Sequence, residues 1–340
     1  MSYRAGVVAL TALVPFVVLA VDPAGWYWFG PIKWLLVSAL VPATAALVAW
    51  SHPLRLTWRP TLVATALVSW VAVTAAFAVD PLYAWIGTPE RHFGVVAWVV
   101  CLLALVTGQA IATDDRSVLA VGLVVAGIAL GGAATAEALG WEPEVFDVGR
   151  RLTATFGSAA YLGAATALLL PCCAGAALDR AVNRGVRVAA TVALPLLAVA
   201  AIGSGARAAW VGLAAAAIVA ASARRDDIRR LVSRLPRRHI GLLALAIAVA
   251  GAAVVMWSPV GDRVATTFDR NEPGGSGRLD EWRVATRVIA DRPLVGAGPE
   301  GYRVVFADGV DRDYEREHGR DPLPDRAHAA PLDIALAGGL

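Results

Sequence analysis

RVAATVALPLLAVAAIGSGARAAWVGLAAAAIVAASA, residues 187–223, holds two long apolar runs that are separated only by GSGA at 203–206. Each run is close to the length of about 17 to 25 residues that a helix needs to cross hydrocarbon about 30 Å thick. A bilayer offers the backbone no hydrogen-bond partners, so such a run folds as a helix that satisfies its own backbone groups. The stretch therefore predicts either a tight hairpin of two membrane helices or one helix with a break.

Apolar runs of similar length occupy most of the remaining chain. Hydrophobic residues make up 58% of the 340 residues and charged residues 17%, whereas soluble domains average about 45–50% and about 25%. We therefore predict an all-α polytopic membrane protein with about nine complete transmembrane helices. The predicted spans are 6–21, 32–50, 61–79, 94–112, 117–139, 158–178, 187–203, 207–223 and 240–257. The first run also resembles a signal peptide, but eight further runs favour an uncleaved helix.

The distribution of arginine predicts the orientation, because connections rich in Arg and Lys stay on the cytoplasmic side during insertion. Arginines are frequent in alternate connections and scarce in the others, which places the amino terminus in the cytoplasm and the long polar loop outside, in the cytoplasmic (inner) membrane. The rich set holds Arg4, Arg55, Arg59, Arg116, Arg180, Arg184, Arg187 and the seven arginines of 224–239; the poor set holds Arg91, Arg150, Arg151 and Arg207.

The polar segment after the last span predicts a separate part of the chain. We expect a transmembrane bundle over 1–257, an extracytoplasmic and mostly helical cap over 258–329, and the start of a tenth helix over 330–340. Within the cap, Leu279, Trp282, Thr286 and Ile289 recur at helical spacing, so we expect a short amphipathic helix with Arg278 at its mouth and an end before Pro293.

Several common classes of site are not predicted. GAGPEG at 296–301 matches the dinucleotide fingerprint, but it lacks the preceding strand and the cytoplasmic location that the fingerprint needs, so a glycine-rich turn is expected. The histidines and cysteines have no metal-ligand spacing, and we expect no metal and no cofactor. The net charge of +3 is explained by the cytoplasmic arginines, which meet membrane lipids, so no nucleic-acid partner is expected.

Five patches, in this order, resemble the O-antigen ligase family and the related O-antigen and capsule polymerases. They extend over most of the chain, and it is their ordered set that is specific. Two positions depart from the family pattern: Ala329 stands where Asn usually follows the histidine, and Ser158-Ala159-Ala160 stands in place of Asn-Pro-Asn. The patches are IGTPERHFGVVAW (86–98), RRLTATFGSAAYLGAATALLLP (150–171), GSGARAAWVGL (203–213), GRLDEWRVATRVIADRPLVGAGPEGY (277–302) and DRAHAAPLDIALAGGL (325–340).

The resemblance implies a GT-C-like, metal-independent glycosyltransferase. Such an enzyme moves a glycan from a polyprenyl diphosphate carrier to a hydroxyl of a lipid or glycan acceptor at the outer face of the membrane. Guanidinium groups bind phosphate oxygens in bidentate fashion, so Arg207 and Arg278, with Arg91 and Arg151, are implied to bind the diphosphate. His328 is implied to act as the general base on the acceptor hydroxyl, because imidazole titrates near neutral pH.

Three alternatives remain open at this stage. A polysaccharide polymerase would use the same donor with a growing lipid-linked chain as acceptor. A membrane transporter would carry ionisable or broken-helix sites near the midplane, whereas these runs are nearly free of charge apart from Glu137. A non-catalytic scaffold is the third, because the chain ends at Leu340, too early for the tenth helix to span, and we expect a fragment or a truncated product.

Overall fold

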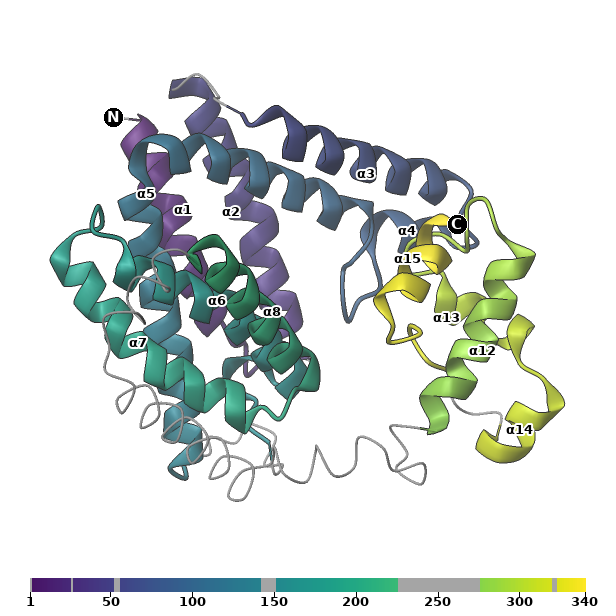
Figure 1. Ribbon diagram of the computed structural model, residues 1–340. Coiled ribbons are helices and arrows are strands. Elements are labelled where there is room, and N and C mark those ends of the chain that lie inside the picture. The colour runs from purple at the N-terminus through teal and green to yellow at the C-terminus, as the bar shows by residue number, and fades with distance from the viewer. Residues whose placement is uncertain (1, 26, 52–55, 142–150, 226–275, 320–322) are drawn as a thin grey trace. The chain divides into compact units, whose positions relative to one another are not determined.

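The computed structural model describes every residue except 1, 26, 52–55, 142–150, 226–275 and 320–322 (Figure 1). The described residues form α-helices and short 3-10 turns, with no strand among them, which confirms the all-α prediction. The chain divides into two compact units, and each is taken by itself below. Unit 1 consists of Met1–Leu10, Trp34–Asp114 and Phe268–Leu340, and unit 2 of Thr11–Lys33 and Asp115–Thr267.

Eight of the nine predicted spans coincide with helical segments, and the ninth, 240–257, lies outside the described residues. Within the described residues, five segments are long and apolar enough to cross a membrane: Gly30–Trp50, Trp58–Ala76, Ser117–Ala138, Ala159–Leu178 and Arg184–Gly203. Shorter apolar helices cover Arg4–Leu19, Val95–Ile111 and Arg207–Ala223. The parent helices are α1 (Ser2–Leu19), α2 (Gly30–Ser51), α3 (Trp58–Ala76), α5 (Val95–Ala138), α6 (Ala159–Leu178), α7 (Arg184–Gly203) and α8 (Arg207–Ala223).

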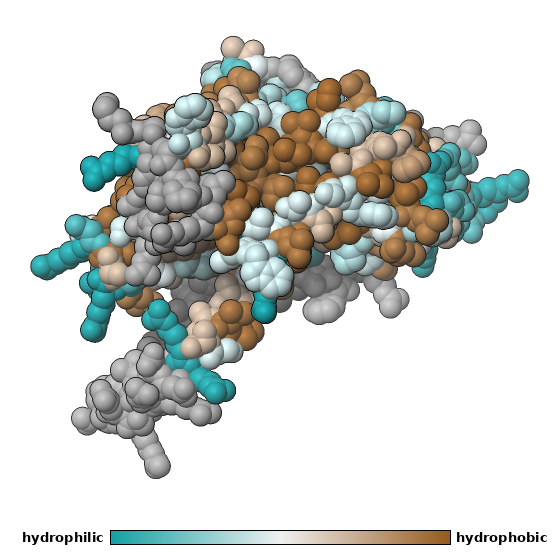
Figure 2. Space-filling model, turned by 90° about the horizontal axis from the view of Figure 1, so that it is seen from above, coloured by the Kyte–Doolittle hydropathy of each residue, from teal (hydrophilic) through white to brown (hydrophobic). Residues whose placement is uncertain are grey.

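The surfaces of these helices carry many large apolar side chains. Phe16, Val63, Leu168 and Ile218 are each more than half exposed, and apolar residues spread over the face that Figure 2 draws. An apolar surface of this extent is unusual for a protein surrounded by water and suits lipid contact. The structure and the composition thus agree on a multi-pass membrane protein.

Helix α5 differs from the sequence prediction. The runs 94–112 and 117–139 were expected to be separate spans with a connection around Arg116, but they form one continuous helix of 44 residues. The connecting sequence ATDDRS, 112–117, contains neither Pro nor Gly, so nothing in it interrupts the backbone hydrogen bonds.

In unit 2, the predicted break between the two runs is present, since α7 ends at Gly203 and α8 begins at Arg207. Helix α6 packs against both α7 and α8. Leu162 and Leu197 are fully buried between them in the core of this unit. Ala206 approaches α6 at Gly163, which has no side chain. A Cβ at Gly163 would lie only 2.4 Å from the Cβ of Ala206. A small residue therefore lets α6 and α8 pack closely.

Lys33, the single lysine of the chain, closes the end of α1 within unit 2. Its Nζ donates to the carbonyl oxygens of Val17, Val18 and Ala20, at 2.8, 3.0 and 2.7 Å, and lies 4.9 Å from the centre of the Phe156 ring. The last carbonyls of a helix lack partners within that helix, and a cation there also favours the negative end of the helix dipole. Lys33 thus has a structural role at a helix end.

In unit 1, the C-terminal residues fold into small helices. Four of them lie within the predicted cap: α12 (Ser276–Asp291), α13 (Tyr302–Val305), η3 (Phe306–Gly309) and α14 (Arg312–His318). The residues predicted to start a tenth helix form α15 (Ala330–Gly338), and the five elements together are called the cap from here on. The predicted amphipathic helix is confirmed as α12, and its end falls before Pro293 as expected. The buried face is shifted, however: Val284, Ala285, Val288 and Ile289 are buried, whereas Leu279 and Thr286 are exposed.

The cap is attached to α3 and its flanking residues in the same unit. The Trp70 indole donates to the carbonyl of Gly338 at 2.9 Å, and the Val79 N–H donates to the carbonyl of Ala297 at 3.2 Å. Ala297 belongs to GAGPEG, which forms a turn with positive φ at Gly296, Gly298 and Glu300, as the prediction of a glycine-rich turn required. The turn therefore joins the end of α12 to α3 and α15.

Candidate functional site

The five predicted site residues fall in two groups. Arg151 and Arg207 belong to unit 2, whereas Arg91, Arg278 and His328 belong to unit 1. Arg278 is the third residue of α12. The two groups are described in turn.

In unit 2, the segment around Arg151 is bound to the turn between α7 and α8. The Arg151 Nε donates to the carbonyl of Ser204 at 2.7 Å, and the Leu152 N–H donates to the carbonyl of Gly203 at 3.0 Å. Ser204 lies three residues before Arg207 in the chain. Packing thus brings Arg151 to the turn from which α8 and Arg207 begin.

The segment that carries Arg151 is held from the other side by Glu137 of α5. The Glu137 carboxylate accepts hydrogen bonds from the backbone N–H groups of Thr153 and Ala154, at 3.0 and 2.7 Å. A carboxylate near the end of a membrane helix is costly unless it is hydrogen-bonded, and these N–H groups satisfy it. Glu137 is therefore a structural support for the segment that carries Arg151.

This end of unit 2 favours anions. Arg207 is the first residue of α8, and the amino end of a helix carries a partial positive charge with N–H groups that point outward. Arg151 adds a second guanidinium beside the turn. Two guanidiniums and a helix amino terminus are a chemical combination that binds phosphate oxygens.

In unit 1, Arg91 lies on a tight turn between α4 (Pro81–Ile86) and α5. The turn closes because Gly87 has φ of 91° and no side chain: a Cβ there would lie 2.3 Å from the carbonyl carbon of His92. The N–H groups of Arg91 and His92 both donate to the carbonyl of Thr88, at 3.1 and 2.7 Å. The turn thereby fixes the backbone from which the Arg91 side chain extends.

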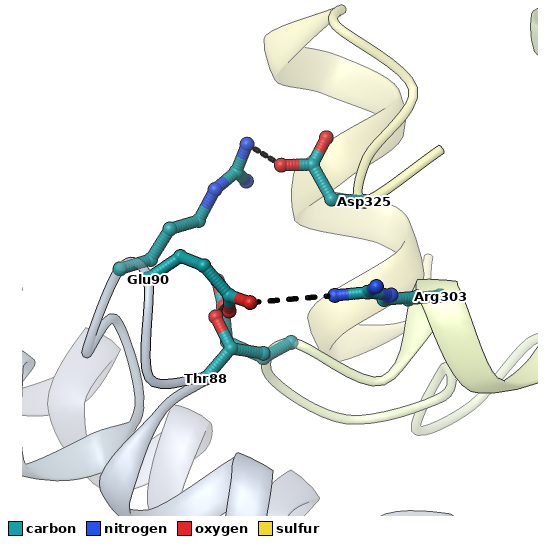
Figure 3. A pocket seen from close by; sticks show the side chains of 6 residues that line it. Thr88, Glu90, Arg303 and Asp325 are labelled. Carbon is teal, nitrogen blue, oxygen red and sulfur yellow. Dashed lines mark hydrogen bonds and ion pairs between the residues drawn. The ribbon is translucent and has the colours of Figure 1, made fainter. Parts of the chain in front are cut away.

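Three polar contacts connect this turn to the cap (Figure 3). Arg91 forms an ion pair with Asp325, Arg303 of α13 lies 3.9 Å from Glu90, and the Thr88 hydroxyl donates to Glu300 at 2.9 Å. These six residues line a pocket of about 100 Å³. It contains three carboxylates and two guanidiniums, so its lining carries a net negative charge. A phosphate would have to displace a carboxylate to bind Arg91 there.

His328 lies next to this pocket, at the entrance to α15. Its Nε2 is 3.8 Å from Oδ1 of Asp325, so the Asp325 carboxylate faces both His328 and Arg91. His328 has φ of 53°, a left-handed conformation that costs a residue other than glycine on the order of 1–3 kcal/mol. Residues held in such conformations are concentrated at functional sites, which supports a role for His328.

The backbone just before His328 is fixed by two elements of the cap. The Ala327 N–H donates to Asp333 of α15 at 2.8 Å, and its carbonyl accepts from the Trp282 indole of α12 at 2.8 Å. Ala327 is fully buried, whereas the His328 side chain is 44% exposed. The His328 side chain therefore extends from a fixed backbone and remains accessible to a substrate.

One group in the cap has the donor atoms of a metal site. Donor atoms of Asp280, Glu317 and His318 lie within 4.8 Å of one another, and His318 Nε2 is 3.2 Å from the Asp280 carboxylate. The spacing argument missed the group because its members come from α12 and α14. Arg283 also pairs with Asp280 and opposes a cation there. The prediction that the chemistry needs no metal stays a prediction.

Sequence reasoning missed most of the pocket. Asp325 had a usable signal, because it lies three residues before His328 in the quoted DRAH block. Glu300 and Arg303 had none, since their partners Thr88 and Glu90 lie far away in the chain and only the packing of the cap brings them together.

Comparison with known proteins gives one positive result. The family model described as O-Antigen ligase matches residues 192–340. No curated protein matches the chain. The matched segment contains α8, α12 and α15 together with Arg207, Arg278 and His328. It confirms the resemblance that the ordered motifs indicated, and supports a membrane enzyme of the ligase or polymerase type. Residues 192–340 of this chain are therefore similar to the O-antigen ligase family.

Proposed function

We propose that the protein is a glycosyltransferase that moves a preassembled glycan from a polyprenyl diphosphate carrier to an acceptor hydroxyl at the outer face of the cytoplasmic membrane. The observation that carries the proposal is the family match, because Arg207, Arg278 and His328 all lie within the matched residues. The distribution of arginine supports a reaction at the outer face, since the arginine-poor connections include the turns that carry Arg91 and Arg207.

The chemistry assigns separate tasks to the two kinds of residue. Arg207 and Arg278 bind the diphosphate and neutralise the charge that develops on it as the glycosidic bond breaks. Arg151 supports Arg207 from the α7–α8 turn through its bond to Ser204. Arg91 could join the diphosphate site only by exchanging Asp325 for a phosphate oxygen.

His328 receives the proton of the acceptor hydroxyl. A neutral imidazole accepts a proton near neutral pH, and the exposed ring lies at the surface of the cap, where an acceptor can approach. No metal is needed for this step, because the leaving diphosphate is a weak base that departs without protonation.

The proposal is tested with the purified full-length chain in proteoliposomes that contain a polyprenyl diphosphate-linked glycan and candidate lipid or glycan acceptors. We expect glycan to appear on the acceptor, with release of the polyprenyl diphosphate. His328→Ala should abolish transfer, whereas His318→Ala should retain it, with the folding of both variants checked by thermal unfolding. Full activity of His328→Ala would remove His328 from the mechanism.

The same assay distinguishes the alternatives. A single addition to the acceptor indicates a ligase, and a ladder of products on the lipid-linked chain indicates a polymerase. Uptake of a labelled solute without any glycan transfer would indicate a transporter.

A further inference from the structure

We propose that Asp325 is a positioning residue for His328 and that Arg91 anchors Asp325. The proposal rests on the proposed role of His328 as the general base. It gives Arg91 a task other than binding the donor diphosphate. It also explains why the turn after α4 and the residues before α15 are connected by charged groups.

The Asp325 carboxylate faces two partners, one with each oxygen. Oδ2 pairs with Nη2 of Arg91, and Oδ1 faces Nε2 of His328 at 3.8 Å. The Arg91 side chain is only 18% exposed, whereas that of His328 is 44% exposed. Asp325 therefore lies between an enclosed cation and an accessible imidazole.

The backbone that carries each partner is held by neighbouring elements. The Arg91 backbone is fixed by the closed turn at Gly87 and by the adjacent contacts of Thr88 with Glu300 and Glu90 with Arg303. On the other side, Ala327 is bonded to α12 and α15. The backbone at Arg91 and the backbone next to His328 are thus both fixed by packed elements, which limits the orientations of the imidazole ring.

This arrangement favours one tautomer of the His328 ring. A carboxylate facing Nε2 favours the neutral imidazole that carries its proton on Nε2, since the N–H can donate toward the carboxylate. Nδ1 then bears the lone pair that accepts a proton. The distance of 3.8 Å exceeds a hydrogen bond, and catalytic hydrogen bonds commonly shorten when substrate is bound.

In the transfer step, the acceptor O–H bond breaks and its proton moves to Nδ1 of His328. The acceptor oxygen bonds to the anomeric carbon of the glycan, and the bond from that carbon to the phosphate oxygen breaks. The electron pair of that bond leaves with the polyprenyl diphosphate. The imidazolium that forms is stabilised by Asp325, which stays ionised beside Arg91. The proton is later released to water.

Other charged groups lie on the elements that form this part of unit 1. They are Glu90 and Arg91 on the turn, Asp280 and Glu281 on α12, Arg303 on α13, Asp325 and Arg326 before His328, and Asp333 on α15. Asp333 already accepts the Ala327 N–H, and Glu90 lies opposite Arg303. Asp325 is the carboxylate that the structure places against the His328 ring, so its removal should have the largest effect.

The test is Asp325→Asn in the full-length chain, followed by the pH dependence of glycan transfer. We expect kcat to fall at least about 10-fold with little change in the KM for the donor. The acidic limb of the profile should move to lower pH, because the lost carboxylate no longer favours the protonated imidazole. Asp313→Asn is the matched control, since Asp313 pairs with Arg316 on the exposed surface of α14. An acidic limb that does not move would overturn the proposal.

A second readout is independent of any activity. The protein has five histidines, so NMR of isotopically labelled histidine can follow the His328 ring through its titration, with His328→Gln to assign the signal. The titration midpoint should be lower in Asp325→Asn than in the wild type and unchanged in Asp313→Asn. An equal midpoint in Asp325→Asn and wild type overturns the pairing. A wild-type protein that shows the ring shift but transfers no glycan contradicts only the proposed function.

Asp325→Glu is the second variant for this test, to be used if Asp325→Asn does not fold. It keeps the negative charge with one more methylene, so it should retain the acidic limb of the wild type and recover a large part of kcat. A limb displaced to lower pH in this variant would contradict the role of the charge.

Discussion

The Arg151 guanidinium donates from Nε to the carbonyl of Ser204 at 2.7 Å, which attaches the segment before α6 to the turn before α8. The contact joins two of the sequence patches that together resemble the O-antigen ligase family. Two patches that are about 50 residues apart in the chain therefore form one local structure. Arg207, three residues beyond Ser204, begins the helix on the far side of this turn.

Arg207→Lys should lower kcat/KM for the lipid-linked donor by about 10- to 100-fold. An ammonium keeps the charge but loses the planar two-point contact, and a hydrogen bond to a charged group contributes about 1.5–3 kcal/mol. Arg187→Lys is the matched control, because Arg187 lies in the first turn of α7 and its Nε donates to the carbonyl of Ala177. Equal activity of both variants would indicate that Arg207 only reaches toward the interface.

Arg91→Gln separates two roles of this arginine. If Arg91 anchors Asp325, the variant should reproduce the lower kcat and the displaced acidic limb of Asp325→Asn, with the donor KM unchanged. If Arg91 binds the diphosphate, the donor KM should rise while the limb stays in place. Steady-state transfer measured over a pH series with varied donor concentration decides between them.

Gly163→Ala should weaken the packing of α6 against α8. The added Cβ would lie 2.4 Å from Ala206 and 3.1 Å from Ala209, so α8 must shift, and overpacking of this kind costs about 1–3 kcal/mol. Gly175→Ala on the same helix is the control, since nothing lies within 4 Å of its Cβ, and alanine there should be neutral or stabilising by up to about 1 kcal/mol. Thermal unfolding in detergent measures both, and equal midpoints would contradict the close approach.

The stability of α14 should fall at acid pH. The pKa of Asp311 is lowered, first because its carboxylate caps α14 by accepting the Tyr314 N–H and then because Arg287 pairs with it. A carboxylate with a lowered folded pKa contributes stability above its unfolded pKa and loses it as pH falls through the folded value. Protection of the Tyr314 amide from hydrogen exchange, corrected for the intrinsic pH dependence, should decrease below about pH 4.

Asp311→Asn tests the same contribution at neutral pH. The amide can still accept the Tyr314 N–H, but it loses the ion pair with Arg287, so the protection of Tyr314 should fall and its acid dependence should vanish. A variant that keeps the wild-type pH dependence would show that another group is responsible.

The sequence could predict features that depend on local pattern. The break at 203–206 follows from two apolar runs with a short polar sequence between them, and α12 follows from helical spacing and the proline after it. The apolar stretches Val95–Ile111 and Ser117–Ala138 coincide with the fourth and fifth predicted spans, but the helix assignment continues between them, because the polar sequence ATDDRS contains neither Pro nor Gly. The buried face of α12 was also shifted, since burial depends on which neighbours pack against the helix.

By itself, the sequence determined a helical membrane protein with a polar C-terminal cap and the family that its C-terminal part resembles, because apolar run length and ordered motifs are properties of the chain. Only the tertiary structure decided that Arg91 pairs with Asp325 and that Arg151 reaches Ser204. The physical reason is that a charged side chain selects its partner by proximity and burial. Both are fixed when helices distant in the chain pack together, and neither is encoded in the spacing around a single residue.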